Sequence, residues 1–406
     1  GGCSSLGEAG SLASSCVEDS FYVCQCAAQR AIAAGHPQSS SAVVNHVNNA
    51  LAQELLEPLV AKAEASATAL GKGGDWDALS GSLTSLTDRL GATGVGALAD
   101  NASHYLGAAA QKVKDQRKVS AGGGSSALLA GAAPGVGADK AVFEAARRAA
   151  LGRARHVVNL SNLEASSGCA KRLRDALKAE VEATFDFGSP AKAQLEACVA
   201  ELGATAQRFE AAQQGVLSAL AQALRPRLRA LVAQVLGEKS GHPGFDLGEE
   251  EDFLVAGASV EWASRFAEGL QALLEPLLGD GLLAPRSAQL LLVPVGDFVA
   301  KRLETSLRRL AFNQAGGLQL DKDLRGVVGW FVARAGRSIK SECFTRLSQF
   351  VSLLTLDALE DATELWADTA EDAHTQGWHL TSDEARKVLA LRVDFDRKQI
   401  DKLNLR

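Results

Sequence analysis

The sequence predicts an all-α protein. From Glu18 onward its apolar residues recur at helical spacing, and almost no stretch shows the alternation of a half-buried strand. Aromatic residues make up only 5% of the 406 residues, so leucine, valine and alanine must supply most core contacts. That composition suits close-packed helices better than sheets, which favour β-branched and aromatic residues. Apolar residues at 47% and charged residues at 22% are typical of a globular chain with a core.

The clearest helix lies in the second half of the chain. Its apolar residues are three or four apart, which places them on one helix face that needs a packing partner. They are Val295, Val299, Leu303, Leu307 and Leu310. Similar patterns predict helices over 43–70, 160–185, 195–236, 253–278 and 324–354. Breaks rich in glycine or proline separate the helices, at 71–74, 188–190, 237–248, 279–285 and 315–317.

These breaks predict a division of the chain into bundles and loops. Residues 120–139 are rich in glycine, alanine and serine and carry little apolar bulk, which is typical of a flexible surface loop. Residues 1–17 are expected to be frayed or disordered, and 237–248 to form a second loop. Helical bundles are expected over 18–119, 140–236 and 249–406. No repeat with a fixed period is visible, so a solenoid is not supported.

Composition also excludes several functional classes. The formal net charge of −6 gives no general attraction to nucleic acid. The most apolar window, 281–300, contains Arg286, Asp297 and two prolines, so it is no candidate for a membrane span. Seven scattered cysteines and no secretory pattern favour reduced thiols in the cytosol. The absence of methionine indicates a processed or incomplete piece of a longer protein.

No motif in the sequence predicts catalysis, a cofactor or a metal. The glycine-rich stretches at 91–96 and 122–137 lack the flanking strand and lysine of a phosphate-binding loop. Cys16, Cys24 and Cys26 lack a fourth zinc ligand at compatible spacing, and on a helix Cys24 and Cys26 point in nearly opposite directions. The seven histidines show no helical metal-binding pair. We therefore expect a protein without a catalytic centre, cofactor or bound metal.

Two clusters of charge leave alternatives open. The basic cluster of Arg147, Arg148, Arg153 and Arg155 is either a site for anionic lipid or, more often for such clusters, a solvated helix face. The acidic run 249–252 favours the start of a helix, where negative charge meets the positive end of the dipole, over an acidic docking spot.

The most organised segment is the C-terminus. Thr381 and Glu384 stand three residues apart, the spacing of a capping box that begins a helix. Val388, Leu389 and Leu391 supply the apolar face of that helix, and we expect it to face the apolar residues of 347–354. A last short helix begins at Asp394 or Asp396.

Residues 378–405, beginning Trp-His-Leu-Thr-Ser-Asp-Glu-Ala-Arg-Lys-Val-Leu, resemble the C-terminal signature of the subunit 4 family of the conserved oligomeric Golgi complex, a vesicle-tethering factor. The resemblance continues upstream through 310–324 and 344–349. Weaker matches at 19–23, 46–50 and 158–163 fall in the family's order. The sequence departs from the family at Ser382, where a proline is usual, and in the glycine-rich segment 120–139. The family's N-terminal half has no counterpart here, which suggests that this end is the one missing.

The resemblance implies an elongated rod of stacked helical bundles with no catalytic centre, acting in retrograde transport within the Golgi and in maintaining glycosylation enzymes. It implies a peripheral location on the cytosolic face of the Golgi membrane. The implied partners are the other subunits of the complex and the membrane surface, with SNARE proteins, SNARE regulators and small GTPases as further candidates and no nucleic acid. It also implies a structural ion pair between Arg346 and Glu384. The alternatives are a subunit of another helical tether such as the exocyst, or a helical lipid-binding protein or enzyme.

Overall fold

A computed structural model describes most of the chain, and within the described residues the fold is all-α, as the sequence predicts. The described residues are 13–71, 136–185, 190–236, 245–246, 261–278, 283–371 and 377–405. Contacts divide the chain into two compact units, one made of Gly1–Gly71 with Arg155–Arg406 and the other of Lys72–Ala154. These units cut across the boundaries expected from the sequence, because the N-terminal helices pack on helices that follow residue 155 rather than on their neighbours in the chain.

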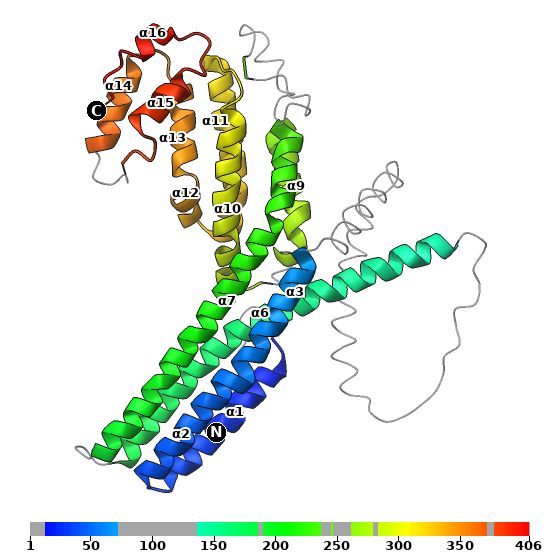
Figure 1. The fold of residues 1–406 in the computed structure, drawn as a ribbon, viewed down its shortest axis with the longest axis vertical. Coiled ribbons are helices and arrows are strands. Elements are labelled where there is room, and N and C mark those ends of the chain that lie inside the picture. Colours follow the sequence, from blue (N-terminus) through cyan, green and yellow to red (C-terminus); the bar gives the residue numbers. More distant parts are fainter. Residues whose placement is uncertain are drawn as a thin grey trace. The chain divides into compact units, whose positions relative to one another are not determined.

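The first helices of the chain pack against α7, the helix Pro190–Leu236 (Figure 1). They are α1 (Ser15–Ala33), α2 (Pro37–Ala50), the π-helical turn η1 (Leu51–Leu56) and α3 (Glu57–Gly71). In α1 the buried residues Val17, Phe21, Ala28 and Ile32 share one face, and the Phe21 ring lies 6.4 Å from that of Phe209 on α7. The expectation that residues 1–17 are frayed is wrong for Ser15, Cys16 and Val17, which begin α1; residues 1–12 lie outside the described part.

The long helix α6 (Val136–Thr184) joins this bundle through polar contacts. His156 is fully buried, and its Nδ1 lies 2.8 Å from Ser66 Oγ on α3. The Asn162 side chain accepts a hydrogen bond of 2.8 Å from the Ser14 N–H, ahead of α1. The last four residues of the expected loop 120–139 are the first turn of α6, and residues 120–135 lie outside the described part.

The helices α9 (Glu261–Leu278), α10 (Pro285–Leu307) and α11 (Gln314–Ala335) form a second group around the end of α7. Next come α12 (Ser338–Cys343) and α13 (Thr345–Leu354), and then α14 (Asp361–Glu371), α15 (Ser382–Leu389) and α16 (Arg397–Ile400). The continuous helix expected over 324–354 is wrong: Gly336 has φ +87°, a conformation that ends α11, and the chain turns again at Phe344.

The break expected at 315–317 is also wrong. Asn313 caps α11 by accepting a hydrogen bond of 2.8 Å from the Gly316 N–H, so both Gly316 and Gly317 lie in its first turn. A Cβ atom at Gly316 would clash with the carbonyl group of Phe245, and one at Gly317 with that of Leu354. The two glycines therefore serve close packing of backbones rather than a turn.

Candidate functional site

The candidate site surrounds the start of α15, where Thr381 and Glu384 form a reciprocal cap. The Glu384 N–H donates to Thr381 Oγ1 at 3.3 Å, and the Thr381 N–H donates to Glu384 Oε2 at 2.9 Å. These bonds satisfy two backbone donors that a helix N-terminus leaves free. They also fix the Glu384 carboxylate in one orientation, close to Arg346.

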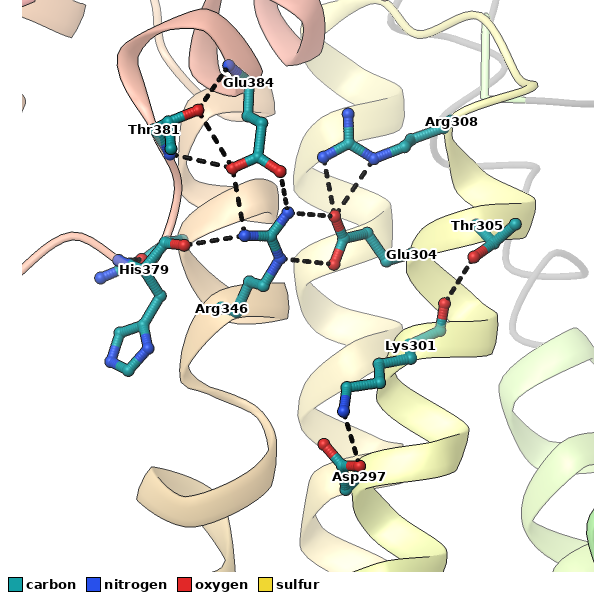
Figure 2. Close-up of polar contacts among 10 residues, drawn as sticks. Asp297, Lys301, Glu304, Thr305, Arg308, Arg346, His379, Thr381 and Glu384 are labelled. Atoms are coloured by element: carbon teal, nitrogen blue, oxygen red, sulfur yellow. Dashed lines mark hydrogen bonds and ion pairs between the residues drawn. The ribbon is translucent and has the colours of Figure 1, made fainter.

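Arg346 reaches this carboxylate from the first turn of α13. Its Nη2 donates to Glu384 Oε1 at 2.6 Å and its Nη1 to Glu384 Oε2 at 3.2 Å, so the pair is bidentate. Nη1 also donates to the carbonyl oxygen of His379 at 2.8 Å. The structure therefore brings Thr381, Glu384 and Arg346 together in one cluster (Figure 2).

A second carboxylate, Glu304 on α10, completes the cluster. Arg346 Nε donates to Glu304 Oε2 and Arg346 Nη2 to Glu304 Oε1, both at 3.0 Å. Arg308, the C-cap residue that directly follows α10, adds two bonds to Glu304 Oε1, of 3.1 and 2.7 Å. A guanidinium group carries five N–H donors, and that of Arg346 makes five hydrogen bonds, to Glu304, Glu384 and His379. The cluster thus ties α10, α13 and α15 together (Figure 2).

The carboxylates of this cluster are held ionised. Hydrogen bonds from Arg346, then from the Thr381 N–H, lower the pKa of Glu384 to about 2. Burial opposes ionisation of Glu304, but hydrogen bonds from Arg346 and Arg308 outweigh it and leave its pKa below the usual range. The same two carboxylates raise the pKa of Arg346. The Glu304 side chain is only 11% exposed, whereas Arg346 and Glu384 are 34% and 32% exposed. The Arg346–Glu384 pair is therefore half-buried, and solvent screens part of its energy.

No sequence motif identifies Glu304 or Arg308 as members of this cluster. The available signal was their spacing of four residues, which favours an intrahelical ion pair. That signal does not reveal Arg346 as a third member, because Arg346 is 42 residues away from Glu304 and on another helix. Only the packing of α13 against α10 brings it there.

A second arginine, Arg392, holds the chain just after α15. Its side chain is fully buried, and it donates to both oxygens of Asp394, at 2.8 and 2.6 Å. It also donates to the carbonyl oxygens of Leu354 and Leu356, both at 2.8 Å, and its Cζ lies 4.1 Å from the centre of the Phe395 ring. These contacts fasten the C-terminal segment to the end of α13. Asp396, and not Asp394, caps the last helix, α16.

The basic cluster expected on α6 is only partly described. The side chains of Arg147, Arg148 and Arg153 lie outside the described residues, and Arg155 is exposed. Within the described segments, no three histidine, cysteine or acidic side chains gather as metal ligands do. None of the helices described here combines the length and apolar character needed to cross a membrane.

The chain matches known proteins from α6 to α15, a range that does not include α1, α2, η1 and α3. The family model for "Conserved oligomeric Golgi complex subunit 4, C-terminal" matches residues 156–387, more than half of the chain. The chain belongs to this subunit 4 family. The matched range contains Glu304, Arg346, Thr381 and Glu384, and it ends before Arg392.

Curated members of the subunit 4 family match the same part of the chain. The Drosophila melanogaster protein is 29% identical over 258 residues, which cover 63% of this chain and 32% of the relative. The Arabidopsis thaliana protein is 28% identical over 250 residues, 61% of this chain and 32% of the relative. The human protein is 27% identical over 260 residues, 61% of this chain and 31% of the relative. The match thus spans about a third of the length of these relatives.

Proposed function

We propose that this chain acts as a subunit of the conserved oligomeric Golgi complex, a non-enzymatic vesicle tether. The observation that carries the proposal is the family match, which runs from α6 through most of α15. The curated relatives from fly, plant and human all bear the name of that subunit. Its first partners are accordingly the other subunits of the complex.

The proposed role includes a cellular location and a transport step. The chain works at the cytosolic face of the Golgi membrane as a peripheral protein, in the retrograde transport that keeps glycosylation enzymes in the Golgi. SNARE proteins, SNARE regulators and small GTPases are candidate partners beyond the complex. The family resemblance supports these assignments, and the charged residues singled out in the sequence are assigned no catalytic role.

The Arg346 cluster has a structural role in this proposal. A binding protein needs helices that keep their relative positions while partners come and go. Arg346 supplies such a restraint, because its guanidinium group joins α10, α13 and the cap of α15. Changes at Arg346 should therefore weaken partner binding through the fold, without any direct contact to the partner.

Affinity capture tests the proposal. The tagged chain, expressed in cells of its source, should recover sister subunits of the Golgi complex, identified by mass spectrometry. The Arg346→Ala variant should recover less of them, whereas Arg325→Ala, which removes an exposed arginine on α11, should recover as much as the unchanged chain. Recovery of exocyst subunits instead would assign the chain to another tether. A bound cofactor, or capture only by anionic vesicles, would favour an enzyme or a lipid-binding protein and contradict the proposal.

A further inference from the structure

The helices α7 and α10 lie side by side and run in the same direction. Gln213 Nε2 on α7 donates to Ser287 Oγ on α10 at 2.7 Å. About three turns later, Arg225 on α7 lies over Phe298 on α10, with 5.4 Å between its Cζ and the ring centre. The residue number thus increases along both helices in the same direction, which makes them parallel.

This register groups three arginines at two neighbouring levels of the two helices. Arg225 and Arg229 are exposed and lie one turn apart on the same face of α7. Arg302 is half-buried and lies one turn after Phe298 on α10, and so at the level of Arg229. We call Arg225, Arg229 and Arg302 the arginine row.

The arginine row carries positive charge that no described carboxylate neutralises. From residue 211 to its end, α7 contains no aspartate or glutamate. On α10, Asp297 pairs with Lys301 at 2.8 Å, and Glu304 is engaged by Arg308 and Arg346.

Arg302 adds a second observation. Its Nε is buried and has no hydrogen-bond partner in the structure. A buried guanidinium N–H without an acceptor is unfavourable, and buried polar groups in proteins are normally satisfied. Among the residues that the structure describes, the row is therefore a cationic strip without a paired carboxylate, on a chain whose net charge is −6.

We propose that the arginine row binds an acidic helix of a partner protein. The two levels of the row, Arg225 at one and Arg229 with Arg302 at the other, are one helical turn apart, about 6 Å, which is also the spacing of carboxylates at positions i and i+4 of a helix. Guanidinium groups bind carboxylates in a bidentate manner, so arginine suits this task better than lysine.

A membrane surface fits the row less well. A membrane-binding surface usually carries large exposed apolar side chains that enter the bilayer. Among the described residues such side chains are Tyr22, Val23, Leu318 and Val393, and none of them lies on α7 or α10. The inference rests on charge and register in α7 and α10, and it stands apart from the family assignment.

Fluorescence anisotropy tests the inference with the full chain and a labelled helical peptide that carries glutamate at positions i and i+4. A peptide with glutamine at the same positions is the control ligand. We expect saturable binding of the glutamate peptide at low salt, weakened at least 10-fold by the triple variant R225Q/R229Q/R302Q, and lost at high salt because the contacts are ionic. The matched control variant K62Q/R208Q/K340Q removes three exposed cations elsewhere and should bind like the unchanged chain.

Circular dichroism first establishes that both triple variants fold. If R225Q/R229Q/R302Q does not fold, the double variant R225Q/R229Q, which leaves half-buried Arg302 in place, replaces it in the binding experiment. Binding of both peptides alike would overturn the inference, as would equal weakening by the control variant or no binding of the glutamate peptide. Vesicles of phosphatidylcholine with phosphatidylserine provide the last comparison. Binding to these vesicles that depends on the row, without binding to the peptide, would assign the row to a membrane and also overturn the proposal.

Discussion

Arg346 and Glu304 lie on different helices, 42 residues apart, and share two hydrogen bonds of 3.0 Å. Glu304 is the least exposed member of the cluster, and it holds Arg346 in the plane that Glu384 needs for its own bidentate contact. The ion pair between α13 and α15 is thus oriented by a third helix, α10.

Replacing Arg346 should destabilise the fold. In Arg346→Ala, Glu384 loses its basic partner and Glu304 keeps only Arg308. Breaking a fully buried pair costs about 3–5 kcal/mol and an exposed one less than about 1 kcal/mol, so a loss of about 2 kcal/mol is expected for this half-buried cluster. Denaturant unfolding measures it. Arg325→Ala, at an arginine that is 79% exposed, should cost less than about 0.5 kcal/mol, and equal losses in the two variants would refute the role of the cluster.

Acid should weaken this part of the fold through Glu384. Because Arg346 lowers its pKa to about 2 in the folded state, the unfolded chain binds more protons at pH values between about 2 and 4.5. The stabilisation is therefore complete above about pH 4.5 and is lost as the pH falls toward 2. We expect the difference in unfolding free energy between the unchanged chain and Arg346→Ala to shrink from pH 6 to pH 3. A difference that stays constant over this range would contradict the assignment.

Asp323 should show the opposite dependence on pH. It is buried on α11, where it accepts hydrogen bonds from Trp262 at 2.7 Å and Gln319 at 2.8 Å. Burial raises its pKa to about 6 despite these bonds, so the folded state binds more protons than the unfolded state between about pH 4 and 6. The stability that protonated Asp323 contributes is therefore greatest below about pH 4. It is lost as the pH rises to about 6, and stability does not change further with this group above that pH.

The variant Asp323→Asn removes this titration. Its stability relative to the unchanged chain should be higher at pH 7.5 than at pH 4.5, by about 1–3 kcal/mol. Unfolding curves at the two pH values measure the effect. Asp321→Asn, on the same helix but half-buried, is the control variant. Parallel curves for Asp323→Asn and the unchanged chain would show that Asp323 is not the group responsible.

Glycines of α11 should respond in opposite ways to alanine. Gly317→Ala places a methyl group against the Leu354 carbonyl, so the backbone must shift, at a cost of about 1–3 kcal/mol. Gly326 lies on the same helix with open space around the position of a Cβ atom. Gly326→Ala should therefore stabilise by about 0.5–1 kcal/mol, because alanine favours the helix. Thermal melting distinguishes the two, and a stabilised Gly317→Ala variant would contradict the close approach.

Much of the helical content could be predicted because its signals are local. Apolar spacing predicted the course of α7 and α10, and the three-residue spacing of Thr381 and Glu384 predicted the cap of α15. The same reasoning failed at 315–317, where glycines suggested a break. There the chain is helical, and the glycines accommodate the backbone of Phe245 and Leu354, which are distant in sequence.

By itself, the sequence determined the all-α class, the cap formed by Thr381 and Glu384, and the family to which the chain belongs. Those depend on residues within a few positions of one another or on a pattern along the chain. Only the tertiary structure decided that Glu304 joins Arg346 and that Arg392 is buried against the end of α13. Such contacts form because helices far apart in the sequence bury their apolar faces together. This packing brings within hydrogen-bonding distance polar side chains whose spacing along the chain gives no sign of the contact.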